Sequence, residues 1–117
     1  MVEEGDQENT LWSLSKLRQM AKGNEAFVLK MQKLFVEQTL VRLAELERAV
    51  SEENYAQVGE IAHKMKPALD SFCIDSMKDS VRRLEKAAEI PAIENRQLAA
   101  DFLAVLKKVV LEMQKAA

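Results

Sequence analysis

The only histidine of this 117-residue chain, His63, is the side chain best suited to chemistry. Successive residues of an α-helix turn by about 100°, so His63 points roughly 130° away from the apolar stripe of its expected helix, toward solvent. Two helix-weakening residues, Gly59 and Pro67, lie one turn before and one turn after it. Lys64 and Lys66 add positive charge beside the ring. An exposed imidazole next to cations can accept and donate a phosphoryl group on a ring nitrogen.

Plainer interpretations of the same residues remain open. His63 can be an ordinary surface histidine, Gly59 can permit close packing of two helices, and Pro67 can make an incidental kink. The functional alternative is that Gly59 and Pro67 keep the surface around the ring low, so that another protein can approach it and also contact Glu60. The lysines are explained equally well by a solvated helix face.

The composition argues against several classes of protein. One cysteine and one histidine do not suffice for the usual His/Cys zinc site, and we expect no metal and no cofactor. No Ser/His/Asp arrangement or Gly-rich phosphate loop supports an autonomous enzyme. Seventeen basic and nineteen acidic residues give a net charge of −2, so neither nucleic acid nor membrane is an expected partner. The lone Cys73 fits a reducing compartment, and we expect a cytoplasmic protein.

The elements that must position His63 are expected to be helices. With three glycines, two prolines and 48% hydrophobic residues, the chain is typical of a single all-α domain. The pattern predicts five helices. The first spans about 15–21 with Ser15 as N-cap, and the second spans 24–50 with Asn24 as N-cap. The third runs from a capping box at Asn54 and Gln57 to about 72, the fourth from 75 or 76 to the break at Ile90-Pro91, and the fifth from 93 to 115.

Apolar residues at steps of three and four define the buried faces of these helices. The stripe of the third helix is Tyr55, Val58, Ala62, Met65, Leu69 and Phe72, and that of the fourth is Met77, Val81, Leu84 and Ala88. Short connections make neighbouring helices antiparallel. We therefore predict an antiparallel up-down four-helix bundle with a short additional N-terminal helix, spanning residues 10–117 after a flexible N-terminus at residues 1–9.

Residues 62–68, Ala-His-Lys-Met-Lys-Pro-Ala, resemble the signature of histidine-containing phosphotransfer (HPt) domains, Ala-His-x-hydrophobic-Lys-Gly-small-small. Leu14-Ser15-x-Leu17, Leu34-Phe35 and Val81-x-x-Leu84-Glu85 stand where such domains carry similar residues, so the resemblance covers roughly residues 10–115. The chain departs from the pattern at two positions. The family's usual glycines four and ten residues after the histidine are Pro67 and Cys73 here.

The resemblance implies a phosphorelay intermediate without kinase activity of its own. His63 would accept a phosphoryl group from a receiver-domain aspartate of a hybrid sensor kinase and pass it to a response regulator. The partner would supply the aspartate and Mg²⁺. Lys66 occupies the family's lysine position and would stabilise the phosphoryl group, with help from Lys64. Because the chain starts at Met1 close to the first expected helix, a free-standing protein is favoured over a domain of a kinase.

A docking surface for that partner is predicted on the second helix. If the second and third helices form a hairpin, His63 lies level with about Val41, and Leu34, Gln38 and Val41 flank the buried stripe. These three residues can instead cover the N-terminal helix or fill the core. We expect a monomer. The alternatives are an unphosphorylated helical adaptor and a bundle that associates with itself.

Overall fold

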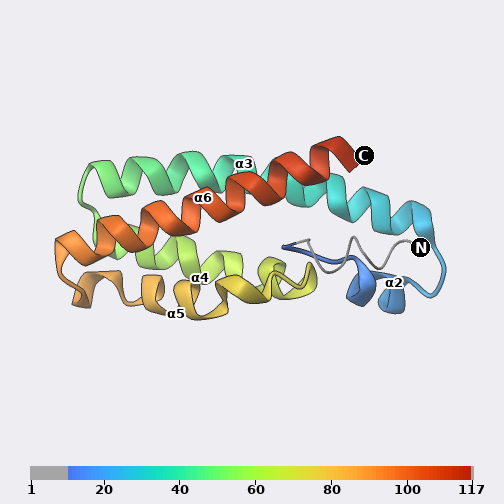
Figure 1. The fold of residues 1–117 in the computed structure, drawn as a ribbon, viewed down its shortest axis with the longest axis horizontal. Helices are drawn as coiled ribbons and strands as arrows, with labels where there is room; N and C mark the ends of the chain where they lie inside the picture. The colour runs from blue at the N-terminus through green and yellow to red at the C-terminus, as the bar shows by residue number, and fades with distance from the viewer. Residues whose placement is uncertain (1–10, 117) are drawn as a thin grey trace.

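The computed structural model describes residues 11–116, and most of these residues lie in helices (Figure 1). The residues expected to be flexible, 1–9, lie outside the described part, as do residues 10 and 117. In chain order the elements are α2 (Ser15–Ala21), α3 (Glu25–Ser51), α4 (Tyr55–Ser71), the 3₁₀ helix η1 (Asp75–Met77), α5 (Lys78–Glu85), the 3₁₀ helix η2 (Ala87–Glu89) and α6 (Ala92–Ala116). No β-strand occurs among the residues described, so the predicted all-α class is confirmed.

The four helices α3 to α6 form an antiparallel bundle. Figure 1 shows α3 and α6 in one layer and α4 and α5 in the other, with consecutive helices running in opposite directions. α3 packs against α4 and α6, and α5 packs against α4 and α6, while the short α2 packs on α3. The predicted up-down bundle with an additional N-terminal helix is therefore correct. Within residues 11–116, no helix combines the length and apolar character needed to cross a membrane.

Asparagine side chains start α3 and α4, as predicted. Asn24 Oδ1 accepts a hydrogen bond from the Phe27 N–H at 3.0 Å, and Asn54 Oδ1 accepts one from the Gln57 N–H at 3.2 Å. Each bond satisfies an N–H that has no partner inside its helix. The capping box at Asn54 is only half formed, because the Gln57 side chain accepts from the Asn54 side-chain amide instead of the backbone N–H.

The start of α2 differs from the prediction that Ser15 is its N-cap. Leu14 holds the N-cap position, and Ser15 is the first helical residue. The Ser15 N–H donates to Ser13 Oγ at 3.1 Å, and the Ser13 N–H donates to the Phe72 carbonyl oxygen at 2.9 Å. The capping oxygen therefore comes from a serine two residues earlier, whose backbone is held against the end of α4.

α4 ends in a Schellman motif centred on Cys73. The φ angle of Cys73 is 55°, the Ile74 N–H donates to the Leu69 carbonyl at 2.9 Å, and the Cys73 N–H donates to the Asp70 carbonyl at 3.1 Å. This left-handed backbone favours glycine. It explains in physical terms why a glycine is usual here in the resembled family.

The segment predicted as one fourth helix is instead a short α-helix between two 3₁₀ turns. A 3₁₀ helix turns by about 120° per residue, so the buried face changes register at η2. Ala87 is buried, whereas Ala88, which was predicted to face inward, is exposed. Asn95 Nδ2 holds this turn by donating to the carbonyl oxygens of Ala87 and Ile90, at 2.7 and 3.0 Å.

The hydrophobic core lies between the four helices. The predicted stripe of α4 is buried from Val58 to Phe72, and Tyr55 is partly buried. In α3, Gln32 and Ala49 are buried, whereas Met31 and Val50 are partly buried. Outside α4 the core residues include Leu17, Val28, Phe35, Leu43, Leu46, Ile74, Met77, Val81, Leu84, Phe102, Leu106, Val109 and Met113.

Candidate functional site

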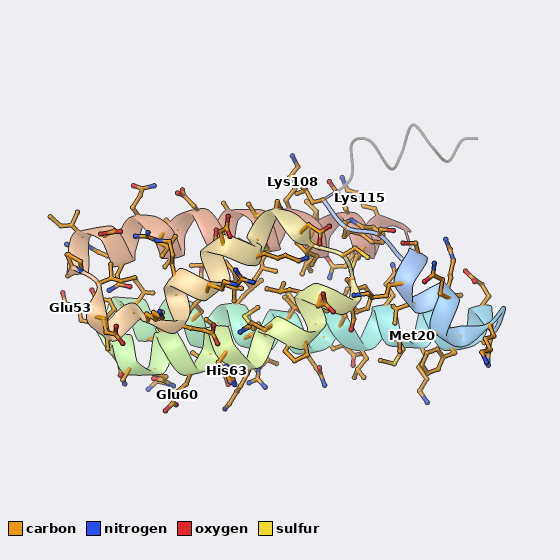
Figure 2. The ribbon with its side chains drawn as sticks, turned by 90° about the horizontal axis from the view of Figure 1, so that it is seen from below. Met20, Glu53, Glu60, His63, Lys108 and Lys115 are labelled. Atoms are coloured by element: carbon orange, nitrogen blue, oxygen red, sulfur yellow. The ribbon has the colours of Figure 1, made fainter. Side chains whose placement is uncertain are left out.

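His63 lies on the outer face of α4, and its side chain is 74% exposed. Figure 2 shows His63 and Glu60 on the same outer edge of the molecule. α4 continues through Pro67, so the helical register of the sequence holds on both sides of the ring. The prediction that the imidazole points toward solvent is confirmed.

α5 brings the carboxylate of Glu85 against this ring. Glu85 Oε2 lies 2.6 Å from His63 Nδ1. Lys66 Nζ lies 3.1 Å and 3.3 Å from Glu85 Oε1 and Oε2. The Glu85 side chain is only 20% exposed, and a carboxylate in such surroundings requires charged or hydrogen-bonding partners. His63, Glu85 and Lys66 therefore form one hydrogen-bonded cluster across the α4–α5 contact.

Electrostatics keep Glu85 ionised. The hydrogen bond with His63 is the main cause that lowers the pKa of Glu85; burial opposes it, and Lys66 lowers the pKa further. A carboxylate with a lowered pKa in the folded state stabilises the fold above the usual glutamate pKa. That contribution is lost as the pH falls through the lowered value.

The contact with Glu85 determines which nitrogen of His63 is available. An ionised carboxylate can only accept a hydrogen bond, so Nδ1 must carry the hydrogen. In the neutral ring Nε2 is then unprotonated and has a free lone pair. The structure gives Nε2 no hydrogen-bond partner among the described residues. The cluster thus presents a nucleophilic nitrogen on an exposed ring whose other nitrogen is anchored.

The two lysines beside His63 occupy different positions. Lys66 pairs with Glu85, so in this structure its ammonium is held by a carboxylate. Lys64 is exposed, and within residues 11–116 it forms no salt bridge. It lines the grooves on both sides of its helix. Lys64 therefore has the ammonium that is free to approach an anion at His63.

The groove that contains His63 runs between α4 and α5. It has a volume of about 520 Å³ and is lined by Tyr55, Ala56, Gly59, Glu60, His63, Lys64, Glu85 and Ala88. Gly59 and Glu60, two of the residues predicted to contact a partner, thus share a groove with the ring. Gly59 itself is buried at the contact with α5, so the packing interpretation of this glycine is correct.

The other predicted docking residues do not line the groove of His63. Pro67 lines a separate groove of about 440 Å³ together with Lys66. Gln38 and Lys64 both line a small groove of about 60 Å³ between α3 and α4. Leu34 and Val41 are 40% and 55% exposed on α3, and they line none of these three grooves. Of the six residues predicted to contact a partner, two therefore line the groove of His63, two line other grooves, and two line none of the three.

Glu85 is the site residue that the residue-by-residue reasoning did not single out. It lies 22 positions from His63, and it entered only as part of the family pattern. The available signal was its place directly after the buried Leu84, at the edge of the face of α5 that packs on α4. Among the described residues, no group of three or more His, Cys, Asp or Glu side chains could hold a metal ion.

The family model of the Hpt domain matches residues 30–116, well over half of the chain. The chain belongs to the Hpt domain family, whose members are helical phosphotransfer modules, carriers and not enzymes, that interact with receiver domains of two-component systems. No curated protein and no solved structure gives a significant match.

Proposed function

We propose that the protein is a phosphorelay intermediate that carries the phosphoryl group on His63. It accepts this group from a receiver-domain aspartate of a hybrid sensor kinase and passes it to a response regulator. The observation that carries the proposal is the anchored ring: Nδ1 is 2.6 Å from Glu85 while the side chain is 74% exposed. Membership of the Hpt domain family supports the same role.

In the accepting step the lone pair of Nε2 attacks the phosphorus of the aspartyl phosphate. A P–N bond forms, the P–O bond to the aspartate breaks, and its electron pair remains on the departing carboxylate. The imidazole keeps the hydrogen on Nδ1 and gains a positive charge. Glu85, already ionised and in contact with Nδ1, stabilises that charge without having to move. Donation to the second receiver domain reverses the same bonds.

The two lysines of the site act on the phosphoryl oxygens. Lys64 is exposed beside the ring, and Lys66 can move from Glu85 by rotation about its flexible side chain. Both would stabilise the anionic group in the phosphorylated protein. The aspartate and Mg²⁺ come from the receiver domain.

The receiver domain covers the surface around His63 in this proposal. Gly59 and Glu60 line the groove of the ring, and Pro67 lines the adjacent groove. Exposed residues of α3 extend this surface, namely Leu34, Gln38 and Val41. The protein is proposed to act as a monomer in the cytoplasm. Light scattering over a range of concentrations tests the monomer, and a mass that rises with concentration contradicts it.

The experiment is incubation with Mg²⁺ and a receiver domain whose aspartyl phosphate carries the label. The expected label on the chain survives base and is lost in acid, as a phosphoramidate is. His63→Gln abolishes it, whereas Lys108→Gln, on the opposite edge of the molecule in Figure 2, retains it. Label retained on His63→Gln excludes His63 as the acceptor. A wild-type chain that takes no label from any receiver domain favours the adaptor without phosphorylation.

A further inference from the structure

Gly59 marks a very close approach between the backbones of α4 and α5. A methyl group at this position would lie 2.6 Å from the Glu85 carbonyl oxygen, 3.3 Å from its carbonyl carbon and 3.5 Å from the Leu84 carbonyl oxygen. Backbone atoms cannot rotate away as a flexible side chain can. To restore an ordinary contact of 3.4 Å, the backbone of α5 would have to move by about 0.8 Å.

The residue whose carbonyl contacts Gly59 is the one whose carboxylate contacts His63. Gly59 and His63 are four residues apart on α4, and residues with this spacing lie on the same face of a helix. The separation of the two backbones at Gly59 therefore sets the distance between the ring and the carboxylate. At 2.6 Å the Nδ1–Oε2 contact is a short hydrogen bond. A shift approaching 1 Å would take it beyond good hydrogen-bond distance.

We propose that Gly59 is a positioning residue for phosphoryl transfer, because it holds α5 close enough for Glu85 to bond Nδ1 and leave Nε2 as the nucleophile. Glycine inside a helix is less stable than alanine, and the close backbone contact explains why glycine stands at this position. The inference rests on the proposed function of His63. It differs from a simple packing role in that the effect of Gly59 must pass through Glu85.

The first test is the tautomer of neutral His63, read from imidazole ¹⁵N chemical shifts. In the wild-type protein hydrogen resides on Nδ1, and Gly59→Ala shifts the population toward the Nε2–H tautomer. Glu85→Ala removes the carboxylate and gives the reference spectrum of a ring without this partner. Gly23→Ala is the matched control, because it strains a backbone at φ +91° with nothing within 4 Å and leaves the tautomer unchanged. A wild-type tautomer in folded Gly59→Ala overturns the proposal.

The second test is a double-mutant cycle on the rate of phosphoryl transfer from a receiver domain. A small misplacement of reacting groups can cost about two orders of magnitude, so Gly59→Ala should slow transfer roughly 10- to 100-fold. In a Glu85→Ala background the same substitution should have no further effect, since both act through one contact. Full additivity of the two losses overturns the proposal, because Gly59 would then act independently of Glu85.

Circular dichroism establishes whether Gly59→Ala folds. If it does not, Glu85→Asp replaces it, because the shorter side chain withdraws the carboxylate while the α4–α5 backbone contact is unchanged. Glu85→Asp should shift the tautomer in the same direction, and an unchanged spectrum contradicts the required distance. The tautomer measurement needs no phosphoryl donor. A chain that accepts no phosphate but shows the expected tautomers would refute the proposed function and leave the positioning role intact.

Discussion

The α3–α6 and α4–α5 contacts both place polar side chains between helices, but the exposed fraction of these side chains differs between the two contacts. In the first, Gln32 is 3% exposed, and its Nε2 donates to the Met113 carbonyl oxygen at 3.2 Å. In the second, Glu85 is 20% exposed and His63 is 74% exposed. The buried bond satisfies a polar group and fixes the relative position of two helices. The half-exposed bond anchors one nitrogen of the ring and leaves the other open to a partner.

The two regions also differ in the residues that separate the helices. α6 contributes large buried side chains to the core, such as Phe102 and Leu106. α4 contributes Gly59 where it meets Glu85, so two backbones come close together. Large side chains in one region give stability through burial. Gly59 in the other region allows a short distance between His63 and Glu85. In this bundle, large buried side chains therefore stabilise the fold, and a small residue brings the functional groups together.

The largest expected effect comes from weakening the scaffold. Phe102 is 1% exposed, and Phe102→Ala should lower the free energy of unfolding by about 3–5 kcal/mol through lost burial and a cavity. Urea denaturation measures this loss. The tautomer of His63 in the folded fraction should stay as in the wild-type protein. A changed tautomer would show that the two regions are not independent.

A smaller effect is expected from removing the charge at the site. Glu85→Gln keeps the size of the side chain but no longer offsets the positive charge of the phosphorylated ring. The rate of phosphoryl transfer should fall roughly 10- to 100-fold, about 1.4–2.7 kcal/mol in barrier height. Quenched-flow kinetics with a labelled receiver domain measure it. A rate equal to that of the wild type would remove Glu85 from the account.

The smallest effect concerns the turn that joins α4 to the segment of α5. Cys73 has a left-handed backbone at φ 55°, and Cys73→Gly removes the strain of that conformation. Glycine also loses more chain entropy on folding, which offsets part of this gain. We expect the free energy of unfolding to rise by about 0.5–1 kcal/mol in thermal or urea denaturation. Ala56→Gly, at an exposed position inside α4, should have the opposite sign. A loss of stability in both variants would contradict the role of the backbone angle.

The parts of the fold that depend on local signals could be predicted from the sequence. Asn24 and Asn54 cap the two helices that they were expected to cap, since a capping bond involves residues three apart. The fourth helix was predicted too long because its ending depends on a residue outside the segment. Asn95, on α6, bonds the carbonyls of Ala87 and Ile90, and no periodicity within residues 75–90 contains that information.

The same division between local features and contacts with other segments holds for the site. The exposure of His63 follows from the register of its own helix, and the structure confirms it. The contact with Glu85 depends on how α5 packs against Gly59, which joins residues more than twenty positions apart. Sequence reasoning left the role of Gly59 open between packing and access. Only the distance to the Glu85 carbonyl distinguishes a glycine required by packing from one that is merely tolerated.

The most direct measurement is a ³¹P and ¹⁵N NMR spectrum of the phosphorylated protein with ¹⁵N in the imidazole ring. The account predicts that phosphorus is coupled to Nε2 of His63 and that Nδ1 retains its hydrogen. Phosphorus on Nδ1, or on no nitrogen of this ring, would contradict it.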